Sequence, residues 1–116
     1  MPVIRDKSVD SAAGDNPDIL RRIFINQNIG ATITTIGELT MAPGSELPLH
    51  THPTEESMII MDGEATSILG EETDTLKPGD LIFAPADVKH SLANRGTKPM
   101  RFIFFHPTVK VSTTRS

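Results

Sequence analysis

Glycine and proline recur so often along this 116-residue chain that no long helix fits after Ile29. The eight glycines and nine prolines separate short segments that are rich in isoleucine, threonine, valine and phenylalanine. Because both residues disfavour the interior of helices and strands, they mark turns. Asp62-Gly63 predicts a hairpin turn, and residues 77–80, which read Lys-Pro-Gly-Asp, predict a β-turn. The pattern predicts one all-β domain whose short antiparallel strands close into a barrel or jelly roll.

Strands are expected between these turns, where the segments are short and rich in β-branched or aromatic residues. They span residues 19–26, 31–41, 47–52, 57–61, 65–69, 73–76, 81–84, 90–94 and 100–106. For the first of them, a short helix with Pro17 in its first turn is the less favoured alternative. We therefore expect a partly flexible N-terminal arm over residues 1–18, a single barrel domain over residues 19–108, and a tail or edge strand over residues 109–116.

Composition and charge disfavour several classes of function. The net charge is −4 at pH 7 and the eleven lysines and arginines are scattered, which argues against nucleic-acid binding. The longest apolar runs, residues 58–61 and 102–105, are far shorter than the ~20 residues that span a bilayer. Because the N-terminus also lacks the apolar stretch of a secretory signal, we expect a cytoplasmic protein. The chain has no cysteine, so nitrogen and oxygen would have to hold any metal.

Two histidines, His50 and His52, are separated by one residue. Side chains at positions i and i+2 of a strand project from the same face, so both imidazoles can reach one metal ion. Glu56 enters on the next predicted strand and His90 on a later one. Three imidazoles and one carboxylate suit a borderline divalent metal, and the spacing does not choose among manganese, iron, nickel, copper, cobalt and zinc.

The spacing of these residues resembles the two motifs of the cupin superfamily. The first motif is matched by Gly44, His50, His52, Glu56 and Gly63, and the second by Gly79, Pro85, His90 and Asn94. One position departs, since Asp87 stands where cupins usually have a glycine, and aspartate is among the few residues that tolerate a positive φ. The resemblance implies a small single-domain cupin with a double-stranded β-helix, or jelly-roll barrel. It also implies that His50, His52, Glu56 and His90 are metal ligands.

For some side chains near this centre, alternation along the strand does not determine whether they point into the barrel or outward. Glu55 is expected in solvent, and His106 is expected to be structural or at the rim rather than in the pocket. Arg101 is expected in a surface salt bridge, whereas an inward Arg101 would bind a substrate carboxylate. The candidate pocket residues are Met41, Met58, Ile60, Phe83, Arg101 and Phe102 (or Ile103).

A site of this kind favours an enzyme over a simple binding protein. The narrowly preferred function is a dioxygenase-type oxidoreductase, in which a small molecule chelated to the metal reacts with dioxygen. The alternative is a lyase or isomerase, in which the metal acts as a Lewis acid and Glu56 or another inward carboxylate moves a proton. A third alternative is a non-catalytic cupin that binds a small ligand. The apolar pocket candidates predict a small substrate with an oily body and an oxygen-bearing head.

The strand that follows Glu56 is apolar on both faces. Met58 and Ile60 alternate with Ile59 and Met61, so only one pair can line the barrel. The other pair lies outside and needs a cover. We therefore expect a homodimer, with an apolar sheet face that includes Ile59 and Met61 at its interface.

Overall fold

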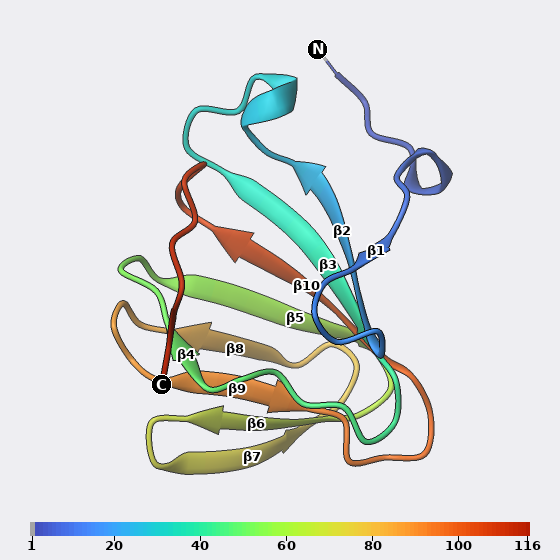
Figure 1. Cartoon of the computed structure of the whole chain (residues 1–116), viewed down its shortest axis with the longest axis vertical. Coiled ribbons are helices and arrows are strands. Elements are labelled where there is room, and N and C mark those ends of the chain that lie inside the picture. Colours follow the sequence, from blue (N-terminus) through green and yellow to red (C-terminus); the bar gives the residue numbers. More distant parts are fainter. Residues whose placement is uncertain (1) are drawn as a thin grey trace.

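The computed structural model describes residues 2–116 as two facing antiparallel sheets (Figure 1). The six-stranded sheet contains, in spatial order, β1 (Ala12–Ala13), β2 (Ile19–Ile25), β3 (Thr35–Met41), β10 (Met100–His106), β5 (Glu56–Asp62) and β8 (Leu81–Ala84). The five-stranded sheet contains β11 (Thr114–Arg115), β4 (His50–Thr51), β9 (His90–Ala93), β6 (Ala65–Leu69) and β7 (Glu72–Leu76). This architecture confirms the all-β jelly-roll prediction.

Helical structure is limited to two single turns, η1 (Asp6–Ser8) and η2 (Gln27–Ile29). Within residues 2–116, no helix has the length and apolar character needed to cross a membrane. Gly30, in the left-handed region at φ +99°, ends η2. Because β2 has already ended at Ile25, residues 31–34 have no strand to pair with, and β3 begins later than predicted.

Two of the predicted turns explain how consecutive strands reverse direction. Gly63, between β5 and β6, has φ +76°, and a Cβ there would collide with the carbonyl oxygen of Pro99. In the turn before β8, the N–H of Asp80 donates to the carbonyl of Lys77 at 2.9 Å, and Gly79 has φ +92°. A positive φ at the third position of Lys-Pro-Gly-Asp defines a type II turn, which glycine accommodates without strain.

The largest difference from the predicted strands concerns the segment that carries the paired histidines. Residues 47–52 were expected to form one strand, but β4 contains only His50 and Thr51. Pro48 has no backbone N–H to donate, so the ladder cannot run through it. The backbone is held on either side of Pro48 instead, because Leu47 N–H donates to the carbonyl of Leu92 and Ser116 N–H donates to the carbonyl of Leu49.

The hydrophobic core fills one end of the space between the sheets. Met41, Ile60 and Met100 have no exposed surface, and Phe102 is 1% exposed. Inward side chains of β10 then continue from this core through Phe104 to His106 at the opposite end. One end of the barrel is therefore packed with hydrocarbon, and the other surrounds a cavity that is lined by the histidines and by apolar side chains.

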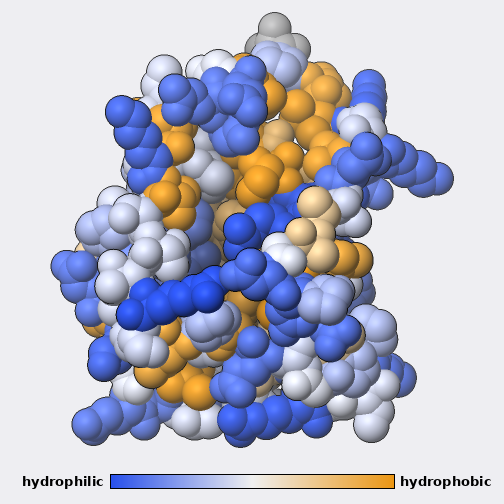
Figure 2. Space-filling view, in the orientation of Figure 1, coloured by the Kyte–Doolittle hydropathy of each residue, from blue (hydrophilic) through white to orange (hydrophobic). Residues whose placement is uncertain are grey.

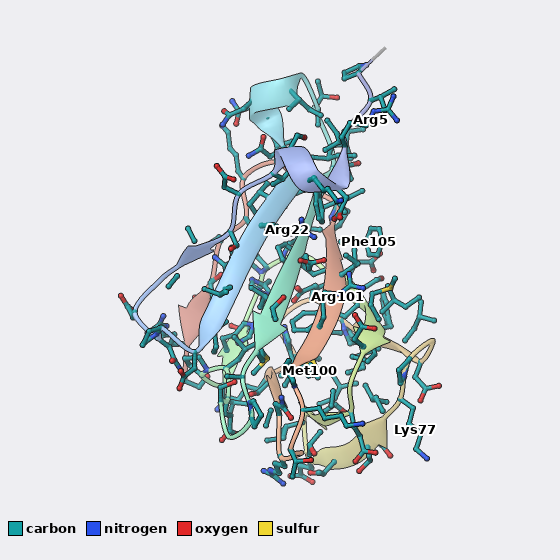
Figure 3. All side chains as sticks on the ribbon, turned by 90° about the vertical axis from the view of Figure 1, so that its right-hand side faces the viewer. Arg5, Arg22, Lys77, Met100, Arg101 and Phe105 are labelled. Carbon is teal, nitrogen blue, oxygen red and sulfur yellow. The ribbon has the colours of Figure 1, made fainter. Side chains whose placement is uncertain are left out.

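The outer face of the six-stranded sheet carries an ion-pair network around Glu38, whose exposed fraction is 3%. Its carboxylate accepts hydrogen bonds from Arg22 Nε at 2.8 Å and from Arg101 Nη1 at 2.8 Å. Arg101 also donates to Asp62 at 2.8 Å. Figure 3 shows Arg22 and Arg101 on this sheet. Arg101 therefore lies in a surface salt-bridge network and not in the pocket, where it was also a candidate.

Candidate metal centre

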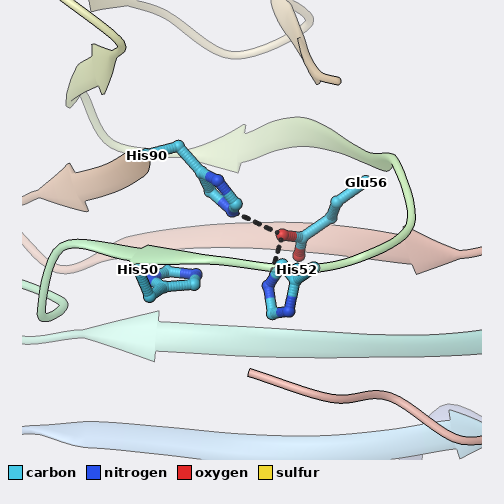
Figure 4. Close-up of side chains that lie close together, drawn as sticks. All are labelled: His50, His52, Glu56 and His90. Carbon is cyan, nitrogen blue, oxygen red and sulfur yellow. Dashed lines mark hydrogen bonds and ion pairs between the residues drawn. The ribbon is translucent and has the colours of Figure 1, made fainter. Parts of the chain in front are cut away.

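The structure brings the four predicted ligands, His50, His52, Glu56 and His90, together at the open end of the barrel (Figure 4). One nitrogen or oxygen from each lies within 4.8 Å of the others. His50 on β4 is the direct register partner of His90 on β9. His52 lies one residue beyond β4, and Glu56 is the first residue of β5.

The loop before β9 is tied to the histidine segment through Asp87. Its backbone N–H donates to the carbonyl of His52 at 2.7 Å. Asp87 has φ +64°, the only non-glycine residue with a positive φ among the described residues. Aspartate thus adopts the conformation that usually calls for glycine at this place in the motif. The contact links the loop that carries His90 to the segment that carries His52.

Each of the three predicted imidazole ligands is oriented by a backbone carbonyl. The Nδ1 atoms of His50, His52 and His90 lie 2.6, 2.8 and 2.9 Å from carbonyl oxygens, which belong to Pro48, Ser112 and Val88 respectively. A carbonyl can only accept, so in each ring Nδ1 carries the proton. The neutral ring then presents an unprotonated Nε2, the tautomer that a metal ligand needs.

Those bare nitrogens face a carboxylate oxygen. Glu56 Oε1 lies 3.0 Å from His90 Nε2 and 3.3 Å from His52 Nε2. Lone pairs on neutral rings and on a carboxylate repel one another at these distances, so the cluster needs a proton or a cation among them. A divalent cation satisfies all of these donors at once, and a three-nitrogen, one-oxygen set suits it. The residues present therefore fit a metal.

The electrostatics of the cluster point in the same direction. In the metal-free cluster, a proton between Glu56 and each of His52 and His90 makes a hydrogen bond to the carboxylate. Burial opposes ionisation of Glu56, but these hydrogen bonds and the nearby His106 outweigh it and lower the pKa of Glu56 to about 2. The hydrogen bond to Glu56 raises the pKa of His52, whereas burial lowers the pKa of His50. Glu56 is thus held as a carboxylate, the form in which it can bind a cation.

A fourth histidine lies against the cluster, contrary to the prediction that placed His106 outside the pocket. His106 is 5% exposed, and its Nε2 lies 3.3 Å from Glu56 Oε2, the carboxylate oxygen that faces away from His90. Its Nδ1 is buried with no hydrogen-bond partner among the described residues. Burial, the largest influence, lowers the pKa of His106. Strict alternation from Phe102 would have placed His106 inward, so the signal was present in the sequence.

A cavity of about 310 Å³ opens onto these side chains. Of the predicted pocket residues, Met58 and Phe102 line it. Met41 and Ile60 do not, because they pack in the fully buried core at the other end of the barrel. Phe83 is 52% exposed, because β8 directs Ile82 and Ala84 inward and Phe83 outward. The predicted pocket therefore included core residues that lie too deep in the barrel. On β8 it also included the outward Phe83 in place of an inward neighbour.

Comparison with known proteins supports the same architecture. The family described as Cupin domain matches residues 37–106. Polyketide synthase CurC of Streptomyces cyaneus is 30% identical over 86 residues, which make up 73% of this chain and 56% of that protein. The chain thus spans little more than half the length of the curated relatives that it matches.

Two solved structures resemble the whole domain. The polyketide cyclase RemF from Streptomyces resistomycificus has a TM-score of 0.88 at 21% identity, over 99% of this chain and 84% of that chain. A predicted oxalate decarboxylase from Thermotoga maritima has a TM-score of 0.82 at 20% identity, over 92% of this chain and 99% of that chain. At such identities the likeness shows a shared fold.

Proposed function

This chain belongs to the cupin domain family, and from that premise we propose that it is a metal-dependent enzyme acting on a small oxygen-bearing organic molecule. One observation carries the proposal. His50, His52 and His90 each donate Nδ1–H to a backbone carbonyl, so all three hold an unprotonated Nε2 ready for a cation. Orientation of ligands by such backbone partners is typical of a metal centre.

The reaction class that we propose is proton transfer beside a carbonyl, as in enolisation or cyclisation. A divalent metal held by the four ligands would polarise the carbonyl oxygen of the substrate. Glu56 Oε2 faces Nε2 of His106, which leaves His106 Nδ1 as a buried nitrogen without a partner. His106 lines the cavity, and the pair that it forms with Glu56 would accept the proton from the neighbouring carbon of a bound substrate. The polyketide cyclase among the structural neighbours supports this class by analogy.

The cavity wall suits a substrate with an apolar body. Leu39, Met58, Phe102 and Phe104 line the cavity together with the histidines. These side chains exclude water around a bound molecule, which strengthens every electrostatic interaction at the reacting carbon. The oxygen-bearing end of the molecule then lies toward Glu56 and the histidines, and its hydrocarbon lies against the phenylalanines.

A dioxygenase remains the second candidate. The specific observation in its favour is the ligand set itself, since three imidazoles and one carboxylate also hold iron(II) and other redox-active metals. The two classes differ in whether turnover consumes dioxygen.

The test begins with elemental analysis of protein purified without chelator or affinity metal. The metal-loaded protein is then incubated in D₂O with 2′-hydroxyacetophenone, a probe with a chelating oxygen pair, an aromatic body and an exchangeable methyl group. We expect deuterium to be incorporated at the methyl carbon in the absence of dioxygen, and NMR measures this exchange. The exchange should disappear in His106→Asn, which keeps the metal.

Dioxygen uptake with no exchange would identify the dioxygenase instead. Binding of the probe without either reaction would identify a non-catalytic binding protein. Protein that neither contains nor takes up a divalent metal would contradict the proposal as a whole.

A further inference from the structure

Arg21 lies on the inner face of the six-stranded sheet, is exposed at the mouth of the cavity, and has no acidic partner among the described residues. It pairs in register with Leu39, which is 4% exposed and lines the cavity, so the two side chains lie on the inner face of the six-stranded sheet. Within residues 2–116, no carboxylate oxygen lies within 4.0 Å of its guanidinium, and no side-chain hydrogen bond involves it. Its neighbour Arg22 faces outward and is bound to Asp6 and Glu38 (Figure 3).

Arg115 approaches the same cavity from the other sheet. It lies directly opposite His50 in the β11–β4 pair, and directly opposed residues share a sheet face. It therefore lies on the side that carries the histidine cluster. Its one ion pair, to Asp15 at 3.8 Å, joins side chains that are 66% and 93% exposed. An exposed pair at that distance contributes little, so Asp15 does not compete strongly for this guanidinium.

The charge of the cavity wall is opposite to that of the whole molecule. Arg21 and Arg115 are the arginines among the lining residues, and Glu56 is the one lining acid, already engaged by histidines. The chain as a whole carries a net charge of −4. Figure 2 shows strongly hydrophilic side chains lying across a hollow at the centre of the viewed face, beside apolar ones. The adjoining cavity, which Arg21 and Arg115 also line, includes Asp10, Asp15 and Glu46, so the positive charge is local to the two guanidinium groups beside the histidine cluster, where it attracts anions.

We propose that Arg21, assisted by Arg115, binds a carboxylate of the substrate at the cavity mouth, while the oxygen-bearing head of the same molecule enters the histidine cluster. This proposal rests on the proposed function, because the two arginines would bind the far end of the same substrate whose head enters the histidine cluster. The planar guanidinium of arginine matches a carboxylate through two parallel hydrogen bonds. The substrate class is thus a small acid with an apolar middle and an oxygen-bearing head.

Two hydroxamates test this assignment without knowledge of the substrate. Butyrohydroxamate and the monohydroxamate of succinic acid have the same metal-binding head and the same chain length, but only the second ends in a carboxylate. Their affinities for the metal-loaded full chain are measured by calorimetry. We expect the carboxylated probe to bind about tenfold more tightly or better, with the advantage shrinking as salt rises.

Arg21→Gln should abolish this advantage and leave the affinity for butyrohydroxamate unchanged, and Arg21→Lys should restore it in part. Arg95→Gln is the matched control, because Arg95 is exposed and lines neither cavity, so it removes the same charge without effect. Equal affinity of both probes for the wild-type protein would overturn the anion site and leave the metal centre intact. Failure of butyrohydroxamate to bind the metal-loaded protein would overturn the proposed function, and the anion site with it.

Discussion

Glu56 has two carboxylate oxygens with different neighbours. Oε1 faces His52 and His90, and Oε2 faces His106. A metal bound at Oε1 leaves Oε2 free to hold the fourth imidazole. Metal binding and the proposed proton transfer therefore both depend on Glu56. Glu56→Gln should lose both activities, whereas His106→Asn should lose the proton transfer and keep the metal.

His52→Ala tests the metal centre at the level of a single residue. We expect the variant to lose its metal and to keep a folded barrel, because two imidazoles and one carboxylate bind a divalent ion much more weakly than the full set. Elemental analysis measures the metal, and circular dichroism measures the fold. His106→Asn, which removes an imidazole that is not a predicted ligand, serves as the control. Metal retention by His52→Ala would contradict the assigned site, and loss of the fold would show that the site is mainly structural.

Glu38 should make the protein sensitive to acid. Burial opposes its ionisation, but hydrogen bonds from Arg22 and Arg101 prevail and lower its pKa below the ordinary value of 4.5. A lowered pKa in the folded state gives stability that is complete above pH 4.5 and is lost as pH falls through the folded value. We expect Glu38→Gln to reduce the free energy of unfolding by about 3 kcal/mol at pH 7.

The difference between Glu38→Gln and the wild type should shrink as the pH falls below 4.5. Urea unfolding from pH 7 to pH 3 measures it, and both proteins lose histidine-bound metal alike in acid. Glu71→Gln, at an exposed carboxyl, is the matched control. A difference that stays constant with pH would contradict the ion-pair explanation.

At the scale of elements, the C-terminal segment contributes to the site as much as a barrel strand does. β11 pairs with β4, and the segment crosses in front of the sheets toward the C-terminus (Figure 1). Val109, Val111 and Thr113 line the cavity, and the carbonyl of Ser112 accepts from His52 Nδ1. The segment was predicted only as a tail or edge strand.

Removal of residues 112–116 should therefore weaken metal binding roughly 10- to 100-fold, the usual effect of losing a partner that orients a ligand. The cause is the loss of the carbonyl that fixes the tautomer of His52, together with the strand opposite His50. Metal titration against a competing chelator measures the affinity. Removal of residues 1–4 is the control, because residues 2–4 contribute no lining to the cavity. An unchanged affinity in the shortened chain would show that water replaces the carbonyl without cost.

At the scale of the whole molecule, the outer face of the six-stranded sheet carries an apolar patch over β5 and β8, beside the ion-pair network around Glu38. Phe83 and Leu81 are 52% and 64% exposed, and the register places Leu81 beside Ile59 and Ile59 beside Ile103. Met61 is also 39% exposed. An apolar face of this kind on a small domain calls for a partner.

The homodimer inferred from Ile59 and Met61 stays a prediction, and the exposed residues sharpen its test. We expect the protein to be a dimer by light scattering at micromolar concentration and Leu81→Glu to be a monomer. Leu20→Glu should remain a dimer, because Leu20 is an exposed leucine of the same sheet but lies on β2, away from the patch on β5 and β8. A wild-type monomer under these conditions would contradict the prediction.

Local patterns in the sequence determined the strands, the turns at Gly63 and Gly79, the positive φ at Asp87 and the grouping of His50, His52, Glu56 and His90. Each depends on alternation or turn geometry within a few residues, or on the spacing of a motif. The chain could therefore be placed in its fold, and its candidate ligands chosen, without coordinates.

Only the tertiary structure decided what surrounds those ligands. Arg115 faces His50 and Ser112 orients His52 because the C-terminal segment pairs with β4, which is distant in the chain. Arg21 lines the cavity through its register with β3, the next strand along the chain. Phe83 was misplaced because a shift of one residue exchanges the two faces of a strand. His106 could have been placed inward by alternation from Phe102. Register between distant strands is set by packing of the whole barrel, so no local pattern contains it.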